Sequence, residues 1–260
     1  MTENLREMKI VVVRQAERNK NAVDPEKREE LTSPARLRAR LLRMRLEWMG
    51  IKPHPSARFV SFQRRSQSTD LEVFGGGNSS SGVPIEKLNN LTSNDEGSHL
   101  RERTYGWVDR ALERYTHVSE EALGRERMRG MLYGPCTPQL LDWVRGGVDE
   151  MIRLSARHAP DSGELHMSVI CHTWWGDLFS ALCRVSLVQG GIFRGSNLQD
   201  VRFEAYPDPL DYGEAIVVKA CFDSEAEELR RVLGVQRIWF PASLKTRDFR
   251  EGVIGFMQAD

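Results

Sequence analysis

The sequence lacks the features that direct a protein to a membrane, to nucleic acid or to an oxidising compartment. Its 260 residues include 37 Lys and Arg and 37 Asp and Glu, so no net charge draws the chain to polyanions. The opening MTENLREMK has no basic segment followed by an apolar one, and no apolar run approaches the length that crosses a bilayer. We therefore expect a cytoplasmic protein with no nucleic-acid or membrane partner. The sequence does not decide the oligomeric state and leaves a homodimer open.

Cysteine is scarce and follows no metal-binding pattern. The chain shows neither CxxC pairs nor zinc-like spacing among its four cysteines, which are Cys136, Cys171, Cys183 and Cys221. Reduced and mostly buried thiols are typical of such a chain. We expect no disulfide, no structural metal and no cofactor.

The order of apolar patterns predicts an α/β fold in a single domain that spans residues 1–260. Residues 8–13, MKIVVV, are a β-branched run typical of a central parallel strand that is buried on both faces. The segment 33–50 then changes to helical spacing, with Ser33 as a candidate cap and Gly50 as a stop. A strand at 56–62 and a short helix at 67–74 follow. This series predicts a three-layer α/β/α sandwich around a mainly parallel sheet.

The remaining two thirds of the chain begin with a long loop. Residues 75–98 are rich in Gly, Ser and Asn and have no periodicity, which is typical of a lid or binding loop. Beyond it the patterns predict helices at 103–115, 137–158, 172–187 and 224–234, and strands at 165–171, 200–206 and 214–222. Thr137 is the expected cap of the second of these helices, with Pro138 in its first turn.

Polar residues follow two of the predicted strands at the point where each strand ends. Arg14 and Gln15 come directly after 8–13, and His172 follows 165–171. Open α/β sheets bind ligands at the carboxyl ends of their strands. These three side chains are therefore the first candidates for a functional site.

Four motifs in order resemble the histidine phosphatase superfamily, in particular its phosphoglycerate-mutase-like branch. Arg14-Gln15-Ala16-Glu17 with Asn21 resembles the Arg-His-Gly-Glu signature of that family and its downstream Asn. The second motif is Ser61-x3-Arg65-x3-Thr69, the third is LRERTYG at 100–106, and the fourth is MSVICH, which ends at His172. The resemblance covers residues from about 9 to about 220 and implies a phosphoglycerate-mutase-like fold.

The resemblance implies a phosphate site with named roles. Arg14, Arg65 and His172 correspond to the groups that surround the phosphate, and Asn21 corresponds to a neutral donor. Glu102 corresponds to the proton donor. These residue types suit the chemistry, because a transferring phosphoryl group needs converging cations and an acid for the leaving oxygen.

Gln15 is the main departure from the family pattern. In the family a histidine stands in its place and forms a covalent phosphohistidine. A glutamine amide is neither basic nor nucleophilic, and the loss of a nucleophile typically costs several powers of ten in rate. We therefore expect a pocket that still binds a small anion but no longer follows a phosphoenzyme mechanism.

The turn after His172 is a second departure. The family usually has small residues there, whereas this chain has Thr173-Trp174-Trp175-Gly176. Adjacent residues on a helix diverge by about 100°, so we expect one indole to pack in the core and the other to line the pocket. Both tryptophans are candidate substrate-binding residues, and they favour a ligand with a flat or apolar part.

Each assignment has a structural alternative. Arg14 could pair with Glu17 or with Glu102 as an ordinary buried ion pair. Glu102 could belong to an exposed charge cluster with its neighbouring arginines, and Arg64 competes with Arg65 for the pocket.

Three functions remain open at this stage. The first is acid/base chemistry of isomerase, cyclase or lyase type on a small phosphate- or carboxylate-bearing molecule. The second is a non-catalytic protein that binds a phosphorylated metabolite or a partner. The third is a phosphomonoesterase inactivated at Gln15.

Overall fold

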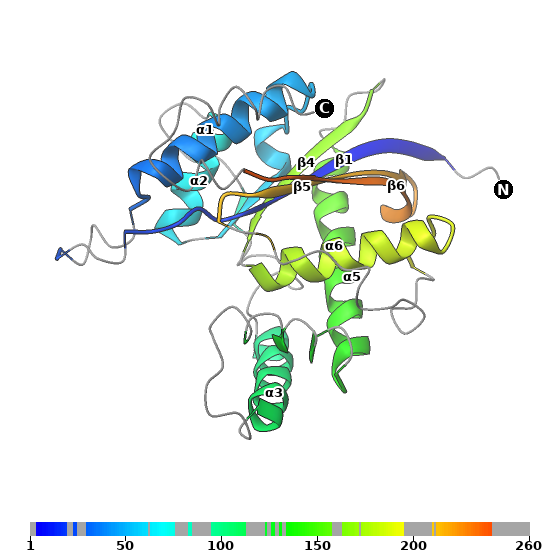
Figure 1. The fold of residues 1–260 in the computed structure, drawn as a ribbon. Helices are drawn as coiled ribbons and strands as arrows, with labels where there is room; N and C mark the ends of the chain where they lie inside the picture. Colours follow the sequence, from blue (N-terminus) through cyan, green and yellow to red (C-terminus); the bar gives the residue numbers. More distant parts are fainter. Residues whose placement is uncertain are drawn as a thin grey trace.

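A six-stranded sheet with helices on both faces forms the body of the protein (Figure 1). The computed structural model describes residues 4–19, 23–24, 30–61, 63–75, 83–84, 95–112, 123, 126–127, 130–131, 134–157, 163–171, 173–194, 210 and 212–240. The strands are β1 (Leu5–Arg14), β2 (Arg58–Val60), β3 (Val83–Pro84), β4 (Leu165–Cys171), β5 (Ala215–Asp223) and β6 (Glu228–Ile238). The helices are α1 (Ser33–Trp48), α2 (Arg64–Phe74), α3 (Asp95–Leu112), α5 (Thr137–Ala156) and α6 (Thr173–Val188), with a short 3-10 turn η2 (Pro55–Ala57) before β2.

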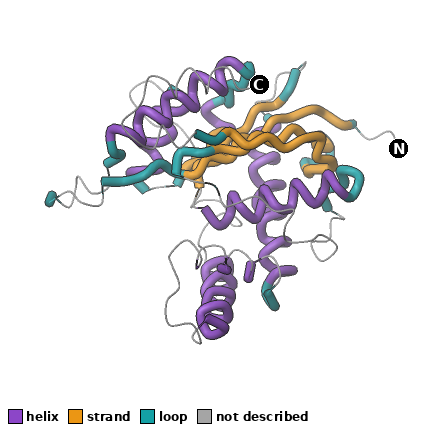
Figure 2. The backbone as a smooth tube through the Cα atoms, viewed as in Figure 1, coloured by secondary structure: helices purple, strands orange, loops and turns teal. Residues whose placement is uncertain are grey.

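The sheet is mixed, with its parallel part on one side of β1. The strand order is β3-β2-β4-β1-β5-β6. Figure 2 shows the strands, in orange, together between the helices. The pairings among β3, β2, β4 and β1 are parallel, whereas β5 is antiparallel to both of its neighbours. Three of the five pairings are therefore parallel, which agrees with the predicted mainly parallel sheet. The parallel arrangement brings the carboxyl ends of β1, β2 and β4 to the same edge.

The apolar run of β1 fills two cores, one on each face of the sheet. Val11 and Val13 pack in the cluster that contains the buried face of α1. Ile10 and Val12 point the other way and pack in the cluster of α5 and α6. Side chains alternate between the faces of a strand, so a run without polar interruptions is required where both faces are covered. Figure 1 shows α1 and α2 on one side of the sheet and α5 and α6 on the other, which confirms the three-layer α/β/α prediction.

Two predicted helix caps are displaced by one residue. Thr32, not Ser33, caps α1, because its Oγ1 accepts the N–H of Ala35 at 3.2 Å. Cys136 precedes α5, and the hydroxyl of Thr137 donates to backbone carbonyls upstream of the helix. Both helices still begin where the sequence places them, since the proline in each first turn fixes the start.

The predicted helix at 224–234 is wrong, because this segment is a turn followed by β6. Asp223 accepts the N–H groups of Glu225 and Ala226 through Oδ1, both at 3.0 Å, and this turn reverses the chain. The next residues pair antiparallel with β5 and bury Leu229 and Val232. Pairing with an available strand outweighs the helix propensity of the glutamates, which is worth only tenths of a kcal/mol per residue.

Part of the predicted loop at 75–98 is ordered. The short strand β3 lies within it, and α3 begins at Asp95. Residues 76–82 and 85–94 lie outside the described part of the chain, and so does the strand predicted at 200–206. Within the described residues, no helix combines the length and apolar character needed to span a bilayer.

The cysteines follow the prediction. All four are free thiols, three of them are buried, and Cys221 is partly buried.

Candidate functional site

The ends of β1 and β4 meet the first turns of α2 at one edge of the sheet. Arg14 ends β1 and lies in register with Cys171, the last residue of β4. The N–H of Gln15 donates to the carbonyl of Cys171 at 3.3 Å, so the chain stays beside β4 for one residue more. We call the residues gathered here the strand-end site, comprising Arg14, Gln15, Ser66, Thr69 and Asp177.

Arg14 is a partly buried cation held by a carbonyl and a ring. Its guanidinium lies over the ring of Tyr212, 4.0 Å from the centroid, and Nη1 donates to the carbonyl of Leu210. Its Nε is buried and has no hydrogen-bond partner among the described residues. Glu17, a predicted partner, lies instead 3.5 Å from Arg38. No described carboxylate forms an ion pair with Arg14, so its charge is available to an anion.

Gln15 is built into the contact between β1 and α2. The side chain is 3% exposed, and its Oε1 accepts a hydrogen bond from Ser66 Oγ at 2.8 Å. The next backbone N–H, of Ala16, donates to Thr69 Oγ1 at 3.0 Å. Thr69 in turn donates to the carbonyl of Arg65 at 2.7 Å. The structure therefore brings the first two sequence motifs together and gives Thr69 a backbone-binding role.

Arg65 lies in the first turn of α2, next to Ser66. Its Nε donates to Gln63 Oε1 at 3.1 Å, and the residue is partly buried. Arg64 is more exposed and reaches Glu30 only at 4.0 Å. The positions agree with the expectation that Arg65 is the inner arginine and Arg64 the solvated one.

Asp177 is a member of the strand-end site that the sequence reasoning missed. It lies in the second turn of α6, is nearly buried, and accepts the N–H of Leu210 through Oδ1 at 2.9 Å. Its Oδ2 is buried without a hydrogen-bond partner among the described residues. Burial raises the pKa of Asp177 to about 7, against the Leu210 N–H and the charges of Arg14 and Arg237. A carboxyl group that titrates near neutrality thus lies at this edge of the sheet.

Other ionisable groups surround Asp177. Glu214 is buried and accepts from Arg237 at 3.2 Å (Nε) and 2.5 Å (Nη2). Burial, together with the nearby Asp177 carboxylate, raises the pKa of the Cys171 thiol far above its usual range. Cys171 is therefore a neutral thiol and no nucleophile.

Trp175 is a core residue, which corrects its prediction as a pocket residue. It is 2% exposed and stacks on Phe179, with ring centroids 5.4 Å apart and planes inclined by 17°. Trp175 therefore packs in the core, as we expected of one of the two indoles. The side chain of Trp174 lies outside the described part of the structure, and so do Asn21 and His172.

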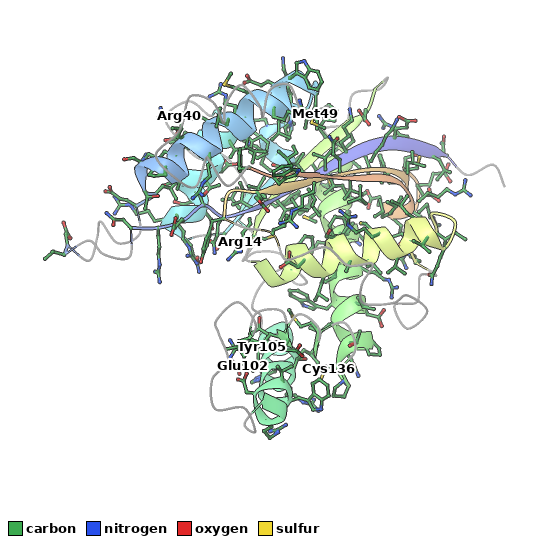
Figure 3. All side chains as sticks on the ribbon, viewed as in Figure 1. Arg14, Arg40, Met49, Glu102, Tyr105 and Cys136 are labelled. Atoms are coloured by element: carbon green, nitrogen blue, oxygen red, sulfur yellow. The ribbon has the colours of Figure 1, made fainter. Side chains whose placement is uncertain are left out.

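Glu102 lies away from the strand-end site. It is exposed on α3, and Figure 3 shows it near Tyr105 and Cys136 and apart from Arg14. It borders a separate pocket of about 390 Å³, whose lining residues are His99, Glu102, Arg103, Gly106, Trp107, Arg110, Pro135 and Cys136. The structure therefore does not bring Glu102 to the predicted anion-binding arginine.

Comparisons with known proteins find structural matches at low sequence identity. No protein-family model and no curated protein matches the chain. Among solved structures, a candidate phosphohistidine phosphatase SixA from Nakamurella multipartitia matches at 15% identity over 88% of this chain and 95% of its own, with a TM-score of 0.42. Mycobacterial hydrolase 2 matches at 14% identity over 92% of this chain and 96% of its own, with a TM-score of 0.40. Because the sequence identities and the TM-scores are both low, these matches assign no role to any residue of this chain.

The strand-end site combines a cation, a neutral amide and a titratable acid. No group of three or more His, Cys, Asp or Glu side chains in the described ranges is arranged to hold a metal ion. Asp177 could have been found from the sequence, since it is a lone carboxylate in the apolar segment WWGDLF shortly after a strand end. The chemistry available to these groups is anion binding and proton transfer.

Proposed function

We propose that this protein belongs to the histidine phosphatase superfamily and binds a small phosphate- or carboxylate-bearing molecule at the strand-end site. In this proposal it performs acid/base chemistry of isomerase, cyclase or lyase type and has lost phosphoryl transfer. Arg14 and Arg65 bind the anion together with Asn21, and Trp174 contacts the rest of the ligand. His172 takes part in proton transfer.

The environment of Gln15 carries the proposal. Its amide follows Arg14 directly and is fixed by Ser66 at 2.8 Å, in a position that is 3% exposed. A side chain so placed can support the pocket but cannot form a phosphoenzyme, because an amide nitrogen is not nucleophilic. The four sequence motifs in family order support the shared ancestry.

The acid/base part is supported by Asp177. A carboxyl group whose pKa is about 7 exchanges protons readily at physiological pH, unlike an ordinary aspartate. Glu102 is the acid that the resemblance implies, but Figure 3 shows it apart from Arg14. Asp177, in contrast, is close enough to Arg14 for the two charges to interact.

A hydrolysis assay tests the loss of phosphoryl transfer. We expect the protein to release no phenolate from p-nitrophenyl phosphate and to form no phosphohistidine. Gln15→His is measured alone and with Ser66→Ala, so that the buried Ser66 hydroxyl is not left without its acceptor. Hydrolysis by the unmodified protein would contradict the proposal, and hydrolysis by the histidine variants alone would favour an inactivated phosphomonoesterase.

Calorimetry with sulfate tests the anion site. Arg14→Gln should weaken sulfate binding by about tenfold or more, because a hydrogen bond to a charged group contributes roughly 1.5–3 kcal/mol. Arg64→Gln is the matched control, since Arg64 lies at the start of α2 but is solvated. Equal loss in both variants would mean that sulfate binds through surface charge and not at this site.

A non-catalytic binding protein is the second candidate. The separation of Glu102 from Arg14 favours it, since the acid that the resemblance implies does not reach the arginine. In that case sulfate would still bind, and its binding would still depend on Arg14. Asp177→Asn and His172→Ala could change only ligand affinity, because there would be no catalytic activity to lose.

A further inference from the structure

One residue, Leu210, joins the two charged groups of the strand-end site. Its N–H donates to Asp177 Oδ1 at 2.9 Å, and its carbonyl accepts from Arg14 Nη1. Its side chain is buried in the core that covers β1 and α6. Asp177 and Arg14 therefore bind the N–H and the carbonyl of the same residue, so the position of each side chain restricts that of the other.

Charged groups on several neighbouring elements act on Asp177. Arg14 faces it from β1, Arg237 from β6, and Glu214 from the residue before β5. Cys171, at the end of β4, is close enough to feel its charge. Arg237 forms an ion pair with Glu214 at 2.5 Å, whereas Arg14 forms no ion pair with a described carboxylate.

We propose that Asp177 is a positioning residue of the anion site, which orients Arg14 through Leu210 and takes up a proton when an anion binds at Arg14. This inference rests on the proposed anion site. The coupling follows from charge alone: an anion on Arg14 is a like charge to the Asp177 carboxylate and favours its neutral form. By linkage, protonation of Asp177 strengthens anion binding by the same factor.

The protonation state of Asp177 can change near neutral pH. Burial without a partner for Oδ2 already brings its pKa to about 7, so a modest further rise changes its protonation between pH 7 and 9. The neutral acid keeps Oδ1 as an acceptor for Leu210, so the grip on that residue does not depend on the charge.

Sulfate calorimetry at pH 7, 8 and 9 tests the inference, since sulfate itself does not titrate there. At pH 8 the unmodified protein should take up a fraction of a proton per sulfate, measured from binding enthalpies in two buffers of different ionisation enthalpy. Its affinity should fall with pH, by up to about tenfold per unit. Asp177→Asn should show no uptake and a flat affinity, whereas the exposed control Asp142→Asn should behave like the unmodified protein.

A second pair of variants isolates the positioning role. At pH 6 Asp177→Asn, which keeps an oxygen for the Leu210 N–H, should bind sulfate within about twofold of the unmodified protein. Asp177→Ala removes that acceptor and should bind about threefold to tenfold more weakly, the range of one hydrogen bond. Equal affinity of the Ala and Asn variants would overturn the positioning role.

The outcomes separate this inference from the function on which it rests. Proton uptake that persists unchanged in Asp177→Asn overturns the inference while leaving the anion site intact. If that variant does not fold, the unmodified protein still decides, because sulfate binding without proton uptake at pH 8 overturns the coupling. Absence of sulfate binding, or an affinity that Arg14→Gln leaves unchanged, overturns the proposed function and this inference with it.

Discussion

Two arginine–aspartate combinations at the sheet differ in how their charges meet. Arg58 of β2 and Asp70 of α2 are both buried and face each other directly, with Nη1 and Oδ2 3.6 Å apart. Arg14 of β1 and Asp177 of α6 form no direct ion pair and are joined through Leu210. Burial raises the pKa of both aspartates, to about 6 for Asp70 and about 7 for Asp177.

The difference separates a structural pair from the pair to which we assign a function in our proposal. Because Arg58 lies directly against Asp70, its charge is balanced within the pair. This buried pair links β2 to α2 and leaves no access for a ligand. A shared residue between Arg14 and Asp177 holds both side chains in place while leaving the cation able to meet a third group. Position alone therefore does not define the site, since both pairs are at the sheet; the geometry of the contact does.

The largest effect should come from breaking the direct Arg58–Asp70 pair, which we call the closed pair. Arg58→Met leaves the Asp70 carboxylate buried without its cation, and we expect a loss of about 3 kcal/mol or more in the free energy of unfolding at pH 8. Urea unfolding measures it, with Arg64→Met as the solvated control that should change stability by less than about 0.5 kcal/mol. A loss below about 1 kcal/mol for Arg58→Met would show that the contact is not structural.

Stability should fall as the pH rises from about 5 to about 7. Both aspartates have folded-state pKa values above the unfolded value of 3.8, so the folded protein holds more protons than the unfolded chain in this window. Each group contributes a decline of at most about 1.4 kcal/mol per pH unit. Urea unfolding at pH 5, 6, 7 and 8 should show that Asp70→Asn flattens the decline below pH 6 and Asp177→Asn extends the flattening to about pH 7. Stability that rises over this range in the unmodified protein would contradict the assignment.

Arg14→Gln should cost less stability than Arg58→Met. It removes one hydrogen bond and one contact with the Tyr212 ring, together worth about 1–2 kcal/mol. Arg14→Gln is also the variant that should lose sulfate affinity. Of the two arginine variants, it should therefore show the smaller loss of unfolding free energy and the larger loss of sulfate affinity. Similar losses of unfolding free energy in both would remove the distinction between the pairs.

The smallest effect is expected from replacing the closed pair as a unit. Arg58→Met combined with Asp70→Leu removes both charges and fills the space with apolar atoms, which is often neutral or stabilising. We expect the free energy of unfolding to stay within about 1 kcal/mol of that of the unmodified protein and sulfate affinity to stay unchanged. A loss as large as in Arg58→Met alone would indicate that packing, not the charge, was the problem.

The sequence predicted well what local patterns decide. The run MKIVVV is typical of a strand covered on both faces, and the proline in the first turn of α1 and of α5 located the start of each helix to within a residue. Arg14 and Gln15 were found because a strand that ends in polar residues brings them to the edge where the parallel strands finish.

What the sequence could not predict depends on contacts between distant segments. The glutamates of 224–228 favour a helix, and only the presence of β5 beside them makes the segment a turn and a strand. Trp175 and its neighbour are equivalent by type, and the place of Trp175 in the core depends on its contact with Phe179. Glu102 was assigned through a resemblance, and nothing local in 100–106 fixes where α3 lies relative to the sheet.

The hydrogen bond from Ser66 to Gln15 also bears on how position 15 can change over time. A histidine there would leave the fully buried Ser66 hydroxyl without the amide oxygen that now accepts from it, at a cost of about 1–3 kcal/mol. A change of Gln15 to histidine alone would therefore lower stability unless position 66 changed as well. Relatives of this chain that carry a histidine at position 15 should therefore differ at position 66 as well, and the two positions should vary together.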